Sequence, residues 1–311
     1  MTLSEILEQL EDTAPGYRHD ALDAAITQRE AITPVLLARL EEAATEPQRF
    51  AESDSPLLLY SLSLLSHFAE AAAHEPLLAI SRLPEPLCEA LLGDAISEIL
   101  PVALWRTAQG HYQGIQSLLA DEQAYDFVRW GAARVLAYAA ARGELDREEV
   151  LAHLDAALSD DPADELTNGG IADAMLGLQP GDYAAHLREL YEKGCIDPWS
   201  LVDDDIDKAL ERSVEESFAE TREEFERSIP DNIHGYLSGW AGFAEPSDEH
   251  FDSRDDDFIL PLGGIPRNDP FNTLPGAHLG VVPKEKTQKA RKQNKTARKA
   301  RKKNRAKKKK R

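Results

Sequence analysis

The sequence predicts an all-α protein, and three observations support this prediction. Apolar residues recur three and four positions apart through most of the chain up to about Pro230, which is the spacing of one face of a helix. Capping signals precede several of these segments, and Thr2-Leu-Ser-Glu5 has the spacing of a capping box. No stretch alternates apolar and polar residues over the length of a strand, so we expect almost no sheet.

The expected helices follow one another closely. The first begins at the Thr2 capping box and places Leu3, Ile6, Leu7 and Leu10 on one face. Thr33-Pro34 and Ser55-Pro56 each set a capping residue before a proline, which is favoured at the first helical position. The helices expected after these starts, and those beyond, are VLLARLEEAA (35–44), LLLYSLSLLSHFAEAAA (57–73), GDAISEILPVALWRTA (93–108), YDFVRWGAARVLAYAAA (125–141), DREEVLAHLDAAL (146–158), GGIADAMLGL (169–178), GDYAAHLRELYEKG (181–194) and DIDKALERSVEESFAETREEFERS (205–228).

A faint internal repeat indicates how these helices are arranged. With a shift of 70 positions, Leu58, Tyr60, Leu65, Phe68 and Ala69 fall on Val128, Trp130, Val135, Tyr138 and Ala139. Half of that shift is about 35 residues, the size of one helix pair in a repeat protein. One pair cannot bury its apolar face alone, so neighbouring pairs stack. We therefore predict a HEAT-like helical-repeat solenoid, and an irregular helical bundle is the alternative.

The composition divides the chain into three parts. We predict a HEAT-like α-helical domain over residues 1–245 and a linker over residues 246–283, which is first acidic and then rich in proline and glycine. Residues 284–311 form a basic tail, which we expect to be disordered when free. Its like charges repel one another, and it holds almost nothing apolar to bury.

Lys and Arg residues concentrate in this tail. Residues 284–311 hold 17 of the 35 Lys and Arg residues, and only one of the 56 Asp and Glu residues, Glu285. The tail therefore carries a formal charge of +16 and the rest of the chain −37, which together give the net charge of −21. Such asymmetry is typical of an interaction tail on a soluble body. The body itself should repel nucleic acid and anionic membranes, because its summed field is negative.

We predict that the tail associates with nucleic acid or the ribosome. Lys and Arg neutralise phosphates and release counterions, which gives an affinity that is independent of sequence and falls steeply with salt. No aromatic residue is interleaved, so stacking on single strands is not indicated. Two alternatives stay open: a solubility appendage, or a tail that folds back on the acidic body. The predicted nucleic-acid-binding residues are Lys289, Arg291, Lys292, Lys295, Arg298, Lys299, Arg301, Lys302, Lys303, Arg305, Lys307, Lys308, Lys309, Lys310 and Arg311.

Three residues near the end of the apolar run at 56–65 have the composition of a metal site. We predict that His67, Glu70 and His74 lie on one helix with the spacing i, i+3, i+7, which places all three on one face, and such clusters bind transition metals. We favour the interpretation that they are partly exposed polar residues beside an apolar stripe. Asp203, Asp205 and Asp207 are excluded as a calcium loop, because Lys208 stands where that loop needs glycine. We interpret them as a negative first turn of a helix.

The sequence contains no recognisable catalytic motif, and we predict no cofactor. GxSxG, Walker A and GxGxxG patterns are absent. Cys88 and Cys195 have no metal-ligand spacing, which favours buried structural thiols in a reducing cytosol. The opening MTLSEILEQLED is too acidic for a signal peptide, and the most apolar run, residues 56–65, is shorter than the roughly 20 residues that span a bilayer. We expect a soluble cytoplasmic protein that does not bind membranes.

Three segments resemble a known family. LSEILEQLE, DSPLLLYSLSLLSHFAE and the segment from Tyr125 to Asp160 resemble an uncharacterised bacterial family of HEAT-like α-helical proteins, known as a domain of unknown function. The resemblance covers roughly Thr2 to Glu245 and implies no known activity. Members of that family can end in a SEC-C zinc tail that begins RNDPCPCGSGKKYKKC. Here residues 267–270 read RNDP, but Phe271 and Asn272 stand in place of the first cysteines, so we predict a degenerate SEC-C-like tail without zinc.

These observations predict a non-enzymatic binding or adaptor protein. Its helical surface would hold an unidentified protein partner, basic because the surface is acidic, and its tail would attach to nucleic acid. One alternative is a metal-dependent helical-repeat enzyme that uses His67, Glu70 and His74. Another is an acidic chaperone for basic proteins with an autoinhibitory tail.

Overall fold

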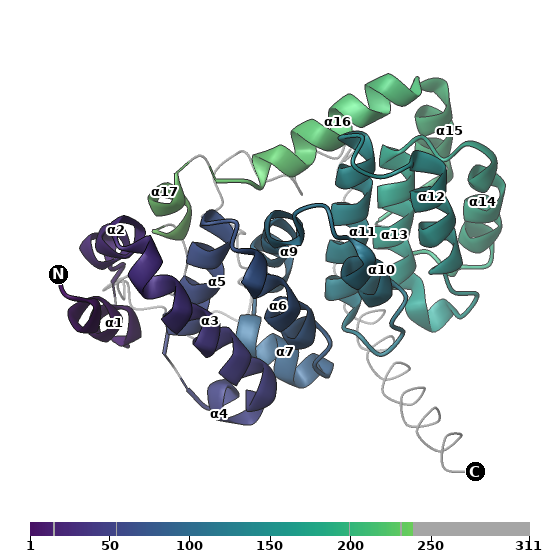
Figure 1. Ribbon diagram of the computed structural model, residues 1–311. Helices are drawn as coiled ribbons and strands as arrows, with labels where there is room; N and C mark the ends of the chain where they lie inside the picture. The colour runs from purple at the N-terminus through teal and green to yellow at the C-terminus, as the bar shows by residue number, and fades with distance from the viewer. Residues whose placement is uncertain (15, 54, 199, 231, 239–311) are drawn as a thin grey trace, which may run out of the picture.

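The computed structural model describes residues 1–238, except residues 15, 54, 199 and 231. Every regular element within these residues is helical, and they contain no strand (Figure 1). The prediction of an all-α protein is confirmed. The predicted linker, residues 246–283, and the predicted tail, residues 284–311, lie outside the described residues.

The helices are short and closely spaced along the chain. Their bounds are α1 (Leu3–Glu11), α2 (His19–Thr27), α3 (Arg29–Thr45), α4 (Pro47–Ala51), α5 (Leu57–His67), η1 (Ala71–Ala73), α6 (His74–Ser81), α7 (Glu85–Leu92), α8 (Ala95–Glu98), α9 (Leu100–Ala108), α10 (Gln113–Leu119), α11 (Asp126–Ala141), α12 (Arg147–Ala156), η2 (Pro162–Asp164), α13 (Glu165–Gly177), η3 (Gly181–Tyr183), α14 (Ala184–Glu192), α15 (Asp203–Glu211), α16 (Val214–Arg227) and α17 (Ile233–Leu237).

Helix α5 is the central helix of the N-terminal half, where it packs between α3 and α9. All of its residues except His67 are buried or nearly so, including serines. The hydroxyl groups of Ser61 and Ser63 donate to carbonyls one turn back, to Leu57 O at 2.7 Å and Leu59 O at 2.9 Å. These bonds satisfy groups that would otherwise be costly to bury.

The expected continuous helix over residues 57–73 is wrong, because the chain turns after α5. Ala69 adopts a left-handed conformation with φ of 51°, which costs a residue with a Cβ roughly 1 kcal/mol. Two side chains from elsewhere in the chain hold this turn. Arg29, at the start of α3, donates to Phe68 O, and Gln109, just after the end of α9, donates to Ala69 O, each at 2.9 Å. The chain then resumes as η1 and α6.

Helices α11 and α13 pack together at the centre of the C-terminal half. A glycine permits this close approach, since a Cβ built on Gly170 would lie 2.3 Å from Trp130 Cγ. Arg129 is buried on α11 and donates to Leu119 O and Ala157 O, each at 2.9 Å. One guanidinium thereby satisfies the C-terminal carbonyls of α10 and α12.

The chain returns from the C-terminal half to the N-terminal half along one segment, residues 214–237, which we call the strap. Figure 1 shows α16 running across the molecule and α17 beside α2. Phe225 of α16 is buried and stacks on Tyr138 of α11, with ring centroids 4.1 Å apart. Thr221 Oγ1 donates to Gly177 O at 2.6 Å and Arg222 donates to Ala141 O at 2.6 Å. The strap is therefore attached to both α11 and α13.

Some of the helix starts predicted from capping signals agree with the structure, and others do not. The Thr2 capping box is confirmed, with Thr2 N donating to Glu5 Oε2 at 2.7 Å. The start predicted at Thr33-Pro34 is wrong, because α3 already begins at Arg29 and contains Pro34. The start at Ser55-Pro56 is displaced by one residue, with Pro56 at the N-cap.

The 70-residue correspondence covers only part of the two central helices. Leu58 and Tyr60 lie in α5 as Val128 and Trp130 lie in α11, but Phe68 and its neighbour follow the end of α5. Their counterparts lie inside α11. The HEAT-like solenoid stays a prediction.

Candidate functional site

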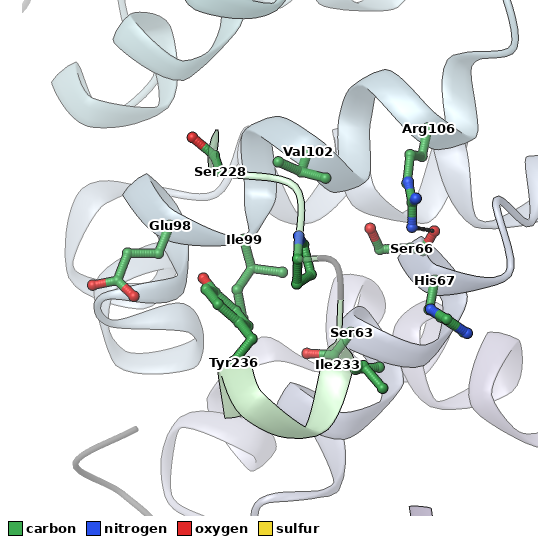
Figure 2. Close-up of a pocket in the computed structure, with 11 residues that line it drawn as sticks. Ser63, Ser66, His67, Glu98, Ile99, Val102, Arg106, Ser228, Ile233 and Tyr236 are labelled. Atoms are coloured by element: carbon green, nitrogen blue, oxygen red, sulfur yellow. Dashed lines mark hydrogen bonds between the residues drawn. The ribbon is translucent and has the colours of Figure 1, made fainter. Parts of the chain in front are cut away.

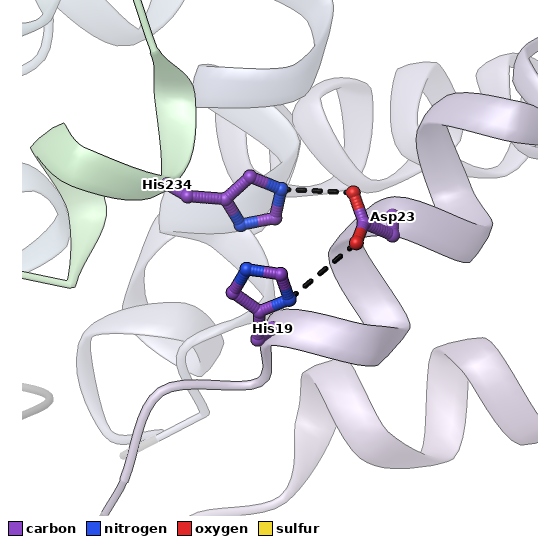
Figure 3. A group of neighbouring side chains, drawn as sticks. All are labelled: His19, Asp23 and His234. Carbon is purple, nitrogen blue, oxygen red and sulfur yellow. Dashed lines mark hydrogen bonds and ion pairs between the residues drawn. The ribbon is translucent and has the colours of Figure 1, made fainter.

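The strap brings three potential metal ligands together from opposite ends of the described chain (Figure 3). His19 and Asp23 lie one turn apart on α2, and His234 lies on α17. His234 Nε2 lies 2.9 Å from Asp23 Oδ1, and His19 Nδ1 lies 3.4 Å from Asp23 Oδ2. One ligand atom from each residue lies within 4.8 Å of the other two. We call these three residues the clasp cluster.

The ring of His234 is the fixed member of the clasp cluster. Its side chain is 18% exposed, whereas those of His19 and Asp23 are 58% and 59% exposed. The ring stacks on His19 at a centroid distance of 4.0 Å, and its Nδ1 lies 2.8 Å from the hydroxyl oxygen of Tyr17. Burial is the main cause that raises the pKa of Tyr17, and electrostatic repulsion from Tyr60 and Asp23 adds to the shift. The phenol therefore stays protonated at neutral pH and can donate or accept.

A small cavity lies between the strap and helices α5, α8 and α9 (Figure 2). Its volume is about 20 Å³, which is room for about one water molecule. His67 lines the cavity, and desolvation is the main cause that lowers its pKa. The nearby positive charges of Arg106 and Arg29 lower it further. The cavity is far smaller than the roughly 300 Å³ that small-molecule pockets begin at. Its lining residues are Ser63, Ser66, His67, Glu98, Ile99, Val102, Arg106, Ser228, Pro230, Ile233 and Tyr236.

The predicted alignment of His67, Glu70 and His74 on one helical face is wrong. His67 ends α5, Glu70 precedes η1 and His74 begins α6, with the left-handed turn between them. Glu70 Oε2 lies 3.8 Å from an Arg29 nitrogen. His74 is buried, and its Nδ1 lies 3.0 Å from Thr107 Oγ1. These contacts agree with a structural role, although His74 is buried rather than partly exposed.

The Asp-rich segment after Val202 begins a helix, as predicted. Asp203 and Asp205 lie in the first turn of α15, and Val202 N donates to Asp205 Oδ2 at 3.1 Å. Carboxylates in this position are favourable because they face the positive end of the helix dipole. Asp203 and Asp207 also pair with Arg188.

Both cysteines are buried, as predicted for structural thiols. Cys88 is 0% exposed and Cys195 1% exposed. Burial raises the pKa of the Cys88 thiol to about 12, and it raises that of Cys195 as well. A thiol is a nucleophile only as the thiolate, so neither side chain is activated for catalysis.

Helices α15 and α16, which are fully described, present an acidic face. Two exposed cations, Lys208 and Arg227, lie among ten exposed carboxylates. The basic tail that complements this charge lies outside the described residues, so the fifteen predicted nucleic-acid-binding residues stay a prediction. The exposed carboxylates are Asp203, Asp204, Asp207, Glu211, Glu215, Glu216, Glu220, Glu223, Glu224 and Glu226.

Sequence reasoning missed the clasp cluster. His19 and Asp23 have the i, i+4 spacing of neighbours on one helical face, which is the only local signal. His234 lies 211 residues beyond Asp23, in a glycine-rich stretch with no strong helical pattern. Only the path of the strap brings it to α2.

Comparison with known proteins places the chain in a family. Residues 1–244 match the family described as "Protein of unknown function (DUF1186)". The chain belongs to this family. The match includes both α2 and the strap, and thus all three residues of the clasp cluster. The predicted relation to a bacterial family of unknown function is confirmed, whereas the degenerate SEC-C-like tail lies outside the matched residues and stays a prediction.

Two relatives are similar to parts of this chain. A protein of Chlamydia trachomatis serovar D, named "Uncharacterized protein", is 24% identical over 226 residues, which cover 71% of this chain and 89% of the relative. A protein of Chlamydia muridarum with the same description is 32% identical over 101 residues, which cover 32% of this chain and 41% of the relative. No solved structure matches the chain. Among the described helices, none is long and apolar enough to cross a membrane.

Proposed function

We propose that the protein is a non-enzymatic adaptor, which holds a basic protein partner on its helical body and attaches to nucleic acid through residues 284–311. The observation that supports this proposal is the division of charge along the chain. Residues 284–311 carry +16 and the remainder −37. Opposite fields at the two ends of one chain favour two different partners, because each end attracts what the other repels.

The acidic face of α15 and α16 supports the part of the proposal that concerns the body. Its ten exposed carboxylates give a negative surface that attracts cationic groups. Asp204, Glu211 and Glu215 make no side-chain hydrogen bond or ion pair with other described residues. These three carboxylates are available to a partner without loss of a contact that holds the fold.

The tail is tested by its removal. Binding of labelled duplex DNA and of a structured RNA is measured by fluorescence anisotropy, at low salt, for the intact chain and for a chain that ends at Pro283. A third protein keeps the full length but carries Gln in place of the fifteen predicted tail residues. We expect that only the intact chain binds the DNA and the RNA. Equal binding by all three proteins, or no binding by any, would contradict the proposal.

The acidic face is tested with a cationic probe. The triple variant Asp204→Asn, Glu211→Gln, Glu215→Gln is compared with Glu8→Gln, Glu30→Gln, Glu41→Gln, which removes three exposed charges from α1 and α3. Both variants have the same net charge, so only the place of the charges differs. We expect weaker binding of an arginine-rich peptide by the first variant alone. Equal affinity would exclude this face as the partner surface.

The same acidic face favours a second candidate function, an acidic chaperone for basic proteins in which the tail acts as an internal competitor. A tethered tail sees a high effective concentration of the body's carboxylates. This function predicts that the chain ending at Pro283 binds the peptide more tightly than the intact chain. The adaptor predicts equal binding of the peptide by both.

A further inference from the structure

We propose that the clasp cluster binds one divalent transition-metal ion, with Zn²⁺ as the preferred ion. The protein ligands are Nδ1 of His19, a carboxylate oxygen of Asp23 and Nε2 of His234. This inference goes beyond the proposed adaptor function and does not depend on it. The bound ion would join α17 to α2 and so fasten the end of the strap to the start of the chain.

The donor set suits this class of ion. Imidazole nitrogen and carboxylate oxygen are both ordinary ligands of Zn²⁺, at about 2.0 to 2.2 Å. Two histidines and one carboxylate leave a fourth position of a tetrahedral ion to water. His19 and Asp23 are 58% and 59% exposed, so solvent can reach that position.

The geometry is close to what a metal requires. With bonds of about 2.0 to 2.1 Å, two ligand atoms of a tetrahedral ion stand about 3.4 Å apart. His234 Nε2 lies 2.9 Å from Asp23 Oδ1 and His19 Nδ1 lies 3.4 Å from the other carboxylate oxygen, Oδ2. One ligand atom from each of the three residues lies within 4.8 Å of the other two. Relative to the ideal separation of about 3.4 Å, the widest pair of ligand atoms has to approach by at most about 1.4 Å. His19 and Asp23 can make this approach by side-chain rotation, since both lie at the surface of α2.

Tyr17 gives His234 the outer contact that metal-binding histidines have. Such histidines almost always hydrogen-bond through the ring nitrogen that is not bound to the metal, which fixes the ring and its tautomer. His234 Nδ1 lies 2.8 Å from the Tyr17 hydroxyl. When Nε2 binds the ion, Nδ1 carries the proton and donates to that hydroxyl oxygen. The ring is therefore already oriented before the ion binds.

Without an ion, the same residues form a polar cluster held by one hydrogen bond, one ion-pair contact and ring stacking, and metal titration separates the two cases. Full-length protein is freed of metal with a chelator, and Zn²⁺ affinity is measured in competition with a chromophoric chelator. The melting temperature is measured with and without Zn²⁺. The variants are His19→Ala, which alters an exposed side chain, Tyr17→Phe, and the control His111→Ala, which removes an exposed histidine elsewhere.

We expect one Zn²⁺ per chain and a higher melting temperature with Zn²⁺. His19→Ala should weaken binding by at least tenfold and abolish the thermal shift, while His111→Ala should change neither. Loss of an outer contact typically weakens metal affinity by about 10- to 100-fold, so Tyr17→Phe should fall in this range. The proposal is overturned if the wild-type chain binds no stoichiometric Zn²⁺, or if His19→Ala binds it as tightly as the wild type.

Discussion

Replacement of Asp173 by asparagine should make the stability of the protein much less sensitive to pH. Asp173 lies partly buried on α13, with Glu224 of α16 and Asp205 of α15 nearby. Burial is the main cause that raises its pKa from 3.8 to about 7; Glu224 and Asp205 add to the shift, while Arg134 of α11 opposes it. An amide has nearly the same shape and never ionises.

The size of the effect follows from the difference between the folded and unfolded states. The unfolded chain releases this proton near pH 3.8 and the folded chain near pH 7. Between these values the folded state binds more protons, so the free energy of unfolding falls as the pH rises. A shift of about three pH units corresponds to about 4 kcal/mol once the group is fully ionised. From pH 5 to pH 8 the change is about 2 to 3 kcal/mol.

Urea unfolding at pH 5 and pH 8 measures this change. The stability of Asp173→Asn relative to wild type should rise by about 2 to 3 kcal/mol between the two pH values. Asp204→Asn removes the same charge from an exposed position on α15 and is the control for overall charge repulsion. A difference between Asp173→Asn and wild type that does not vary with pH would refute the reasoning, because it would mean that Asp173 is already ionised in the fold at pH 5.

Three further predictions concern packing and reactivity. Phe225→Ala removes a buried ring stacked on Tyr138. The free energy of unfolding should fall by about 3 to 5 kcal/mol, and proteolysis between α16 and α17 should be faster. An equal loss in Phe225→Leu would show that the ring stacking does not matter. Gly170→Ala sets a Cβ 2.3 Å from Trp130 Cγ and should lower the free energy of unfolding by about 1 to 3 kcal/mol. The control Gly235→Ala, at an exposed position of α17 with room for a Cβ, should be neutral or stabilising. Equal effects of the two variants would contradict the close packing of α13 on Trp130. Cys88 and Cys195 should react with a thiol reagent at pH 8 only after unfolding, because burial raises the pKa of both thiols. Rapid reaction of the native protein would contradict their burial.

Local chemistry explains what could be predicted from the sequence. The Thr2 capping box needs only residues that are neighbours in the sequence, and it formed as expected. A second capping box lies at Ser213, where Ser213 N donates to Glu216 Oε2 at 2.8 Å. This capping box divides the expected helix over residues 205–228 into α15 and α16. This break could have been found, because a capping box has a fixed spacing.

Distant contacts explain what could not be predicted. The turn at Ala69 contains no glycine, and it is held by Arg29 and Gln109, which lie about 40 residues away on either side. The clasp cluster depends on a pairing across 211 residues. Neither contact has a periodic pattern in the sequence, because each is set by the way whole helices pack.

The salt dependence of nucleic-acid binding tests the central claim most directly. Affinity for duplex DNA is measured for the intact chain from 50 to 200 mM salt. If the tail makes about 6 to 10 phosphate contacts, affinity should fall by about 10³- to 10⁵-fold over this range. A steep linear slope on logarithmic axes, lost in the chain that ends at Pro283, is the result that the adaptor predicts. A flat slope, or the same slope without the tail, would contradict it.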